Sequence, residues 1–598
     1  MASLSLRFSL LLTALLPLTA FTGVGGVTLP QTHADVYDYI VVGGGSAGSI
    51  VASRLSENRS VSVLLIEGGP SNEGVTNSII PYIYPRLYGS TYDWNYTTVP
   101  QSGLNGRATP YLRGHILGGS SSINGMTLHR APAADWDQIA SFTGDLSFSW
   151  NNIIQYIQKN EAFKRPEGSR FDNTYDPAVH GFKGPIGSSM VEDDTWITEP
   201  TLTAAEEVGI PHSRDVNGGQ PLGVSWQQFT VKDGARSSAA TGYINKQDKV
   251  RSNLRVLLNS TVSRVLPRPG GNTTSGPLHF TTVEYTDGNG NTQTAVASRE
   301  IIISTGVIAT PGLLMRSGLG PRAQLQAAGI TTLLDIPAVG QYLQDRCGLS
   351  AIWSVNNTDT DDDIDRNSTY FNELLQEWNN HRTGRLTQTG YRHILWARVP
   401  EDAPIFSTIE DPSSGPTCPH YEIYPTNKWA GTSPRPETGN FVTMSIFVSA
   451  SNVRGSVTLD ASNPMNPIID PKYLGSDWDR YVMRTAVRRA AEYMSAPSWR
   501  RWNATPVFDP SILDNDGALD QWIQTNAIGG VHAVGSARMG PPNSPPGTDV
   551  VGPDFRVKGI RGLRIVDTSV FPFVMNAHTM GPTYIMAEKA ADLIKRGL

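Results

Sequence analysis

The chain has 598 residues, enough for several domains, and its composition is that of an ordinary globular protein. Its net charge of −6 is modest, and it contains neither a run of basic residues nor a nucleic-acid-binding motif, so no nucleic-acid partner is expected. Only two cysteines are present, Cys347 and Cys418, which excludes a disulfide scaffold and a four-cysteine zinc site but leaves open whether the two pair or stay free.

Residues 1–26 are typical of a secretory signal peptide. Arg7 supplies a positive charge, and residues 8–21 form an apolar stretch followed by small residues. This stretch is shorter than the roughly 20 residues of a membrane span, so an uncleaved N-terminal anchor is only the alternative. We therefore expect a secreted, extracellular glycoprotein with no membrane span. Its N-x-S/T sites begin at Asn58, Asn95, Asn259, Asn272, Asn356, Asn367 and Asn503.

The segment 38–48 has the pattern of a dinucleotide-binding turn. Tyr39–Val42 is an apolar run typical of a buried parallel strand, and glycines follow in the order G-x-G-x-x-G at Gly43, Gly45 and Gly48. In this motif the first glycine permits a tight turn, the second lets a pyrophosphate approach the backbone, and the third lets the next helix pack on the strand. The alternative interpretation is a glycine-rich turn without a nucleotide.

The residues after these glycines strengthen the prediction. A helix is expected from Ala47 to about Leu55, so that Ser46 and Ala47 lie where its N-terminus faces the phosphates. A second apolar strand, Val61–Ile66, ends in Glu67, whose position suits a ribose hydroxyl and disfavours a 2′-phosphate. The pattern does not distinguish NAD from FAD.

Weaker patterns predict further elements. The glycine- and serine-rich stretch Arg113–Met126 is suited to wrapping a polar cofactor, with a structural turn as the alternative. The acidic cluster Asp359–Asp363 is interpreted as a solvated loop. The other expected elements are a strand, turn and strand over Asn253–Val265, a buried strand at Glu300–Ser304, a helix that begins at Leu313–Ser317, and a helix over Asp477–Met494.

Two histidines near the C-terminus are the candidates for chemistry. His532 lies in VHAVGSARM, and His578 lies in NAHTMGPTYIMAEKAADLIK. A helix is expected to begin just after Pro582, because proline suits a first turn, and to end at Lys595–Gly597. Histidine titrates near neutral pH and is therefore suited to accepting a proton from a substrate.

These motifs together resemble the glucose–methanol–choline (GMC) oxidoreductases, which are FAD enzymes. Gly114–Asp137 and Gly306–Gly320 look like the two signatures of the family, and the stretches around the two histidines look like its catalytic segments. The resemblance runs from about Tyr37 to the C-terminus. Within the family the chain looks closest to fungal aryl-alcohol oxidases and pyranose dehydrogenases, because it shares DWNYTT, FDPSI and the segment Pro434–Gly439.

The resemblance implies an α/β fold (α+β overall). A Rossmann-like FAD-binding domain would be built from non-contiguous segments, beside a substrate-binding domain with an antiparallel sheet. We expect residues 37–345 in the FAD domain with excursions into the substrate domain, residues 346–525 mainly in the substrate domain, and residues 526–598 returning to the FAD domain with the histidines.

Carried over residue by residue, the resemblance also predicts the cofactor site. Gly234–Ser238 would begin a helix packed near the flavin, and the backbone of Val262 would contact the adenine. The predicted FAD-binding residues are Gly43, Gly45, Ser46, Ala47, Gly48, Glu67, Leu117, Gly119, Ser120, Asn124, Gly125, Met126, Val262, Asp567, His578 and Thr579.

Several positions depart from the family pattern, among them Arg346, which stands where LQDH would place a histidine. Ile123 stands where some members have a histidine that bonds covalently to the flavin, so the FAD is expected to be non-covalent. Gly125 and Val531 stand where aryl-alcohol oxidases have aromatic residues, so the aromatic gate over the substrate is expected to be incomplete.

The predicted function is oxidation of an alcohol (CH–OH) to a carbonyl, with proton abstraction by His532 or His578 and hydride transfer to FAD. Aryl or allylic alcohols are the first choice of substrate and pyranose sugars the second, with O₂ or a quinone as electron acceptor. A lyase or cyclase that keeps FAD without net oxidation is the alternative of another class. No H-E-x-x-H or G-x-S-x-G motif is present, so neither a metal nor a serine hydrolase is expected, and the chain is expected to be a monomer.

Overall fold

The nucleotide-binding unit predicted from the glycine motif forms the centre of one large sheet. The computed structural model describes residues 35–598 except 193–194, 246–249 and 269–275, so the predicted signal peptide and Asn272 lie outside the described residues. In this sheet the strand order is β11-β2-β1-β14-β13-β12, and β26 and β25 add to β14 and β13. The bounds are β1 Asp35–Val42, β2 Val63–Ile66, β11 Leu254–Leu257, β12 Thr261–Pro267, β13 Leu278–Thr286, β14 Thr292–Ile303, β25 Ile560–Arg561 and β26 Leu563–Ile565.

The long strand β14 joins two kinds of pairing in this sheet. Its last residues pair in parallel with β1 on one side and with β26 on the other, whereas its first residues also pair antiparallel with β13. The parallel strands β11, β2, β1, β14 and β26 therefore form the Rossmann-like core, and β26 comes from the C-terminal part of the chain. The prediction that this domain is assembled from non-contiguous segments is confirmed.

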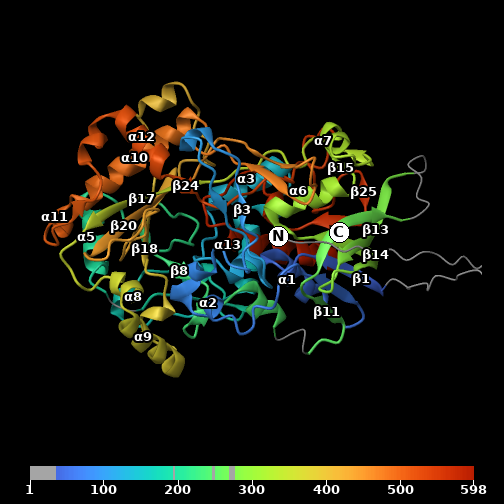
Figure 1. Ribbon diagram of the computed structural model, residues 1–598, viewed down its shortest axis with the longest axis horizontal. Coiled ribbons are helices and arrows are strands. Elements are labelled where there is room, and N and C mark those ends of the chain that lie inside the picture. The colour runs from blue at the N-terminus through green and yellow to red at the C-terminus, as the bar shows by residue number, and fades with distance from the viewer. Residues whose placement is uncertain (1–34, 193–194, 246–249, 269–275) are drawn as a thin grey trace, which may run out of the picture. The chain divides into compact units, whose positions relative to one another are not determined.

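A second sheet is antiparallel throughout, as predicted for the substrate side. Its order is β23-β17-β20-β19-β18-β7, with β24 paired to β17, and in Figure 1 it lies apart from the first sheet. The helices α10 and α12 pack beside it. The bounds are β7 Gly223–Trp226, β17 Cys347–Ser354, β18 His393–Ala397, β19 Tyr421–Thr426, β20 Phe441–Val448, β23 Thr505–Pro506 and β24 Ile528–Gly529.

The helices and remaining short strands connect these two sheets. The helices are α1 Ser46–Leu55, α2 Thr76–Ile79, α3 Ala133–Thr143, α4 Trp150–Asn160, α5 Thr198–Glu207, α6 Gly306–Arg316, α7 Arg322–Ala327, α8 Asp362–Arg366, α9 Ser368–His381, α10 Asp477–Met494, α11 Pro497–Arg500, α12 Asp516–Asn526 and α13 Met580–Arg596. The short strands are β3 Tyr96–Thr97, β4 Pro110–Tyr111, β5 Glu161–Phe163, β6 Ile186–Met190, β8 Gln228–Phe229, β9 Val231–Lys232, β10 Ala235–Arg236, β15 Leu319–Gly320, β16 Leu334–Asp335, β21 Ser456–Leu459 and β22 Pro467–Asp470. Among the described residues, no helix is long and apolar enough to cross a membrane.

A buried ion cluster fixes α13, the helix that follows His578. Glu588 on α13 is fully buried and accepts hydrogen bonds from the Arg54 guanidinium of α1 at 2.8–3.0 Å and from the Tyr243 hydroxyl at 2.6 Å. Breaking a buried pair of this kind leaves an uncompensated charge, which costs about 3–5 kcal/mol. The cluster therefore ties the histidine-bearing end of the chain to the nucleotide-binding helix.

Two predicted elements are wrong in their details. The helix expected to begin at Leu313–Ser317 is α6, which begins at Gly306 although it contains Pro311. Proline cannot donate a hydrogen bond to the carbonyl four residues earlier, and here the Ser536 hydroxyl donates to that carbonyl of Val307 at 2.6 Å. The C-terminal helix α13 begins at Met580, so Pro582 lies within its first turn rather than before it.

The prediction of a solvated loop at the acidic cluster Asp359–Asp363 holds only for its two ends, because Asp359 and Asp363 are exposed while the residues between them are buried. Asp361 and Asp362 are buried, and the Asp362 carboxylate accepts the backbone N–H groups of Trp429 and Phe441 at 2.9 Å. Arg385 pairs with Asp361 at 3.3 Å. Partners distant in sequence thus explain the burial of these charges. The two cysteines, left open by the sequence, are both free and buried.

Candidate active site

Each of the three motif glycines is required for a different structural reason. Gly43 has φ +97°, and a Cβ placed there would lie 2.5 Å from the carbonyl oxygen of Ser304. A Cβ at Gly48 would lie 1.9 Å from the carbonyl oxygen of Gly43, so this glycine lets α1 pack on the turn, as the motif predicts. A Cβ at Gly45 would meet no protein atom closer than Gly119 Cα at 3.9 Å. Gly45 is therefore not required by the fold itself; it keeps a space open at the N-terminus of α1.

This open space is part of a cavity of about 480 Å³ that extends to both histidines. Among the predicted site residues, Gly48 and Leu117 do not line it: Gly48 packs against the turn, and Leu117 is buried beside Gly44. The predicted residues that do line the cavity are Gly43, Gly45, Ser46, Ala47, Glu67, Gly119, Ser120, Asn124, Gly125, Met126, Val262, His532, Asp567, His578 and Thr579. The shape and the helix N-terminus fit an elongated dinucleotide with its pyrophosphate beside Gly45.

Two buried carboxylates hold the backbone turns of the cradle. Glu67 at the end of β2 accepts the N–H groups of Gly44 at 2.7 Å and Gly69 at 2.8 Å. Asp567 accepts the N–H of Gly306 at 2.9 Å and the Thr310 hydroxyl at 2.7 Å, so it caps α6 from more than 250 residues away in sequence. Burial raises the pKa of both carboxyl groups.

The two histidines meet at the other end of the cavity. The rings of His532 and His578 have centroids 4.4 Å apart. The backbone N–H of His532 donates to Asp345 Oδ1 at 2.7 Å, and His578 Nε2 lies 2.9 Å from Glu422 Oε1. Arg346 donates to the carbonyl of Met575, in the loop before His578, at 2.8 Å. The fold therefore brings together two side chains that are 46 positions apart in sequence.

The electrostatic surroundings make the two histidines unequal. Burial, together with the nearby His578 and Arg346, lowers the pKa of His532 well below its ordinary value, and its Nδ1 has no hydrogen-bond partner. Burial alone would raise the pKa of Glu422, but His578 and Arg346 outweigh it and hold the pKa at about 2. His532 is consequently neutral at neutral pH and able to accept a proton, while His578 faces a permanent carboxylate.

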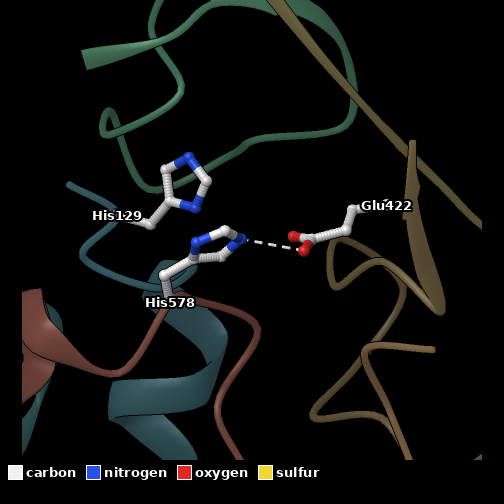
Figure 2. A group of neighbouring side chains, drawn as sticks. All are labelled: His129, Glu422 and His578. Carbon is white, nitrogen blue, oxygen red and sulfur yellow. Dashed lines mark hydrogen bonds and ion pairs between the residues drawn. The ribbon is translucent and has the colours of Figure 1, made fainter. Parts of the chain in front are cut away.

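Glu422 also belongs to a cluster that could in principle bind a cation. Figure 2 shows His129 and His578 side by side with Glu422 hydrogen-bonded to His578, and the ligand atoms of the three lie within 4.8 Å of one another. However, Arg346 Nη1 lies 3.4 Å from the other oxygen of Glu422, and His129 Nε2 is bonded to Gln227 at 2.7 Å. The Arg346 guanidinium already compensates the charge of Glu422 and would repel a metal cation, so we interpret the cluster as a polar network around His578.

The substrate side of the cavity is aromatic, and the expected incomplete gate at Gly125 is wrong. A Cβ at Gly125 would lie 2.4 Å from the Tyr391 hydroxyl and 3.2 Å from the Tyr84 hydroxyl, so tyrosines from other segments fill this space. Tyr424 lies 5.0 Å from Tyr391 and 6.3 Å from His578, and Phe447 lies 6.2 Å from His532, measured between ring centroids. We refer to Tyr84, Tyr88, Tyr391, Tyr424 and Phe447, all of which line the cavity, as the aromatic wall.

Sequence reasoning missed the aromatic wall, Asp345, Glu422 and His129. His129 lies in the signature-like stretch Gly114–Asp137, and Asp345 is the aspartate of the LQD stretch, but neither pattern marks the residue as part of the site. Glu422 and the residues of the aromatic wall lie in no recognised motif, because only the fold brings their segments to the histidines. Arg346 gave a signal, since it replaces the histidine that usually follows LQD in the family. The helix predicted to begin with Gly234–Ser238 begins later, as a short π-helix at Ala240–Ile244.

Comparisons with known proteins cover nearly the whole chain. The two GMC oxidoreductase family models match residues 37–347 and 451–587. Dehydrogenase eriK of Hericium erinaceus is 38% identical over 100% of both chains, and pyranose dehydrogenase 2 of Leucoagaricus meleagris is 37% identical over 93% of this chain and 92% of its own. The structure of a fungal aryl-alcohol oxidase superposes with a TM-score of 0.80 at 27% identity, covering 94% of this chain and 99% of that one.

Proposed function

This chain belongs to the GMC oxidoreductase family and is an FAD-dependent oxidoreductase acting on CH–OH donors, and from this premise we propose that its substrates are aryl or allylic alcohols, oxidised to carbonyl compounds. The observation that carries the choice of substrate is the aromatic wall beside the two histidines. Flat, unsaturated groups pack well on such rings, and each aromatic pair contributes about 0.5–1.5 kcal/mol beyond area burial.

The hydroxyl groups of the aromatic wall support this choice over a sugar. Tyr391 Oη donates to the carbonyl of Gly125 at 3.1 Å and accepts from the Thr127 hydroxyl at 3.3 Å. The Tyr391 hydroxyl is thus engaged within the protein, so this tyrosine offers ring surface rather than a free donor. A pyranose has several hydroxyl groups that each need a partner when buried. The pyranose dehydrogenase relatives keep sugar oxidation as the second candidate.

The proposed chemistry follows from the positions of the two histidines. Bound FAD supplies the acceptor for the electron pair that leaves the carbinol carbon. Neutral His532 takes the hydroxyl proton, and His578, held by Glu422, orients the alcohol oxygen.

Anaerobic mixing of the purified holoenzyme with an alcohol panel tests the proposal. We expect benzylic and allylic primary alcohols to bleach the flavin absorbance, with D-glucose and saturated alcohols of similar size much slower. Faster reduction by D-glucose would instead support the sugar oxidation. Product formation while the flavin stays yellow would support the lyase or cyclase alternative. Reoxidation by O₂ and by a quinone, measured next, identifies the acceptor.

We further propose that the protein is secreted, glycosylated and monomeric. The signal-like residues 1–26 support secretion, and the six predicted glycosylation asparagines among the described residues are all exposed. These are Asn58, Asn95, Asn259, Asn356, Asn367 and Asn503. Recovery from culture medium, with a mass that falls on glycosidase treatment, is the expected result; retention in the cell pellet would contradict it.

The FAD should be non-covalent. Ile123 is buried and lines the cavity, but its hydrocarbon side chain cannot bond to the flavin. The nearby His115 does not line the cavity, and its two ring nitrogens lie 3.1 Å from the carbonyl of Thr91 and 3.0 Å from that of Gly68. After acid precipitation, all yellow colour is therefore expected in the supernatant. Colour that stays with the washed pellet would show a covalent bond.

The rate constant of flavin reduction should stay nearly constant as the pH falls from about 8 to about 5.5. Burial, His578, Arg346, Arg113 and His129 all lower the pKa of His532, so the neutral base persists to lower pH than for an ordinary histidine. With an ordinary pKa of about 6.5, roughly nine tenths of the base would be protonated at pH 5.5 and the rate would fall about tenfold. Anaerobic stopped-flow measurements across this range decide between the two profiles.

A further inference from the structure

Asp345 is a buried carboxylate that the chemistry above does not use, yet it contacts the segment carrying the base. It precedes β17, is 1% exposed, and lies beneath the loop that holds His532. We propose that Asp345 is a positioning residue that fixes the backbone of His532, and hence its ring, for proton abstraction. This inference rests on the proposed function, because it assigns Asp345 a role at the same site.

The Asp345 carboxylate is fully occupied by hydrogen-bond donors. Its Oδ2 accepts the hydroxyls of Tyr111 at 2.8 Å and Tyr473 at 2.6 Å. Its Oδ1 accepts the backbone N–H of Arg346 at 2.8 Å and that of His532 at 2.7 Å. Two tyrosine hydroxyls from other parts of the chain and the neighbouring N–H of Arg346 thus hold the carboxylate in place, and the fourth donor is the backbone of His532. Asp345 therefore does more than stabilise its own surroundings, because it hydrogen-bonds directly to the backbone of the residue that carries the proposed base.

The backbone around His532 has a strained conformation that other contacts must keep in place. Val531 has φ +54°, a left-handed conformation that is rare and costly for a β-branched residue. Its carbonyl accepts a hydrogen bond from Arg113 Nη1 at 2.8 Å. Arg113 and Asp345 therefore bind the carbonyl and the N–H of the same peptide group, the one that joins Val531 to His532. Strain of this kind persists only where surrounding contacts enforce it. Without the Asp345 bond, the segment is free to relax and the ring to move.

The position of the ring matters because His532 must reach the alcohol oxygen while the carbinol carbon faces the flavin. The ring lies 4.4 Å from that of His578 and 6.2 Å from that of Phe447, measured between centroids, but its own Nδ1 has no hydrogen-bond partner. No side-chain bond from Nδ1 therefore orients it, and its placement comes through the backbone. A displacement of about 1 Å can cost roughly 10²-fold in rate.

Asp345→Asn tests this role. An asparagine has one oxygen and one NH₂ group, so it cannot accept from both donor pairs, and its NH₂ must face either the tyrosine hydroxyls or the two backbone N–H groups. Compared with wild type, we expect faster hydrogen–deuterium exchange in peptides covering residues 528–536. In the FAD-loaded variant, flavin reduction should slow about 10–10²-fold, while the apparent Kd for the alcohol changes less than about threefold. FAD content should be unchanged.

Asp479→Asn is the matched control. Asp479 is 2% exposed, lies on the same substrate side, and accepts the Ser451 hydroxyl at 2.8 Å, but it touches neither histidine segment. We expect this variant to leave both exchange at 528–536 and flavin reduction close to wild type. An equal loss in both variants would show that any buried carboxylate on this side is required for stability, and would overturn a specific role for Asp345.

Tyr473→Phe covers the case in which Asp345→Asn does not fold. It removes one hydroxyl from Oδ2 and keeps the ring, so a smaller change in the same exchange and rate measurements is expected. Wild-type exchange and wild-type reduction in either folded variant would overturn the proposal. If no alcohol reduces even the wild-type flavin, the proposed function fails, but the exchange measurement still decides whether Asp345 holds the His532 segment.

Discussion

His532→Ala should keep FAD bound but slow its reduction by alcohol by about 10²–10⁴-fold, the usual contribution of a general base. His532 is neutral, lines the cavity and lies beside His578, so its removal takes away the proton acceptor without touching the nucleotide cradle around Gly45. The measurement is anaerobic stopped-flow reduction with a benzylic alcohol, after the flavin content of each preparation has been determined.

Two other histidine variants make this experiment specific. His393→Gln changes a buried histidine of β18 whose ring lies tilted against that of Trp226, 4.3 Å away between centroids. This histidine does not line the cavity, so the variant should reduce at close to the wild-type rate. His578→Asn should be milder than His532→Ala, because an amide can still hydrogen-bond the alcohol oxygen. If His532→Ala is reduced at the wild-type rate, the base is assigned to His578. If His532→Ala and His578→Asn are both reduced at the wild-type rate, the proposed mechanism is refuted.

Gly45→Val should abolish FAD binding while the protein still folds. The space above Gly45 is empty of protein atoms to 3.9 Å, so the new side chain would occupy the place of the pyrophosphate rather than clash with the chain. We expect the affinity for FAD to fall by at least about 100-fold, which corresponds to about 2.7 kcal/mol of binding free energy. The purified variant is expected to be colourless, with a far-UV circular dichroism spectrum like that of the wild-type apoprotein.

Gly48→Val is the comparison variant, in which we expect the defect to lie in folding rather than in FAD binding. Its Cβ would overlap the carbonyl of Gly43 at 1.9 Å, so α1 could not pack on the turn, and we expect little soluble protein at all. The yield of soluble protein, compared between the two variants and the wild type, separates the two effects. A Gly45→Val protein that stays yellow would place the pyrophosphate elsewhere, and one that is as insoluble as Gly48→Val would show that Gly45 also serves the fold.

The sequence predicted the elements that depend on local patterns. The strand–glycine–helix unit around Gly43, the long helix Asp477–Met494 and the end of α13 at Gly597 follow from periodicity, turn chemistry and capping, and all are confirmed. The two histidines could be singled out because each lies in a recognisable stretch, and the structure places their rings side by side.

The other features of the structure depend on contacts between segments that are distant in sequence, and no local pattern predicts such contacts. The start of α6 was misplaced because Ser536 satisfies the carbonyl that Pro311 leaves without a donor. The burial of Asp361 and Asp362 does not follow from the local pattern, because their partners Arg385, Trp429 and Phe441 come later in the chain. The aromatic wall was missed for the same reason: Gly125 indicated an open gate, but Tyr391 and Tyr84 fill the space from distant segments. The prediction was thus weakest on the substrate side, where specificity resides.

The position of β26 near the end of the chain bears on when, during synthesis, this protein can bind its cofactor. It completes the parallel core by pairing with β14, and the residues after it supply Asp567, which caps α6, and His578. A nascent chain that is still attached to the ribosome by its last residues has made the glycine turn but lacks this edge of the nucleotide cradle. We therefore expect FAD loading to follow release of the finished chain, and a message truncated shortly before residue 560 to yield a protein that does not acquire flavin, however much FAD the cell contains.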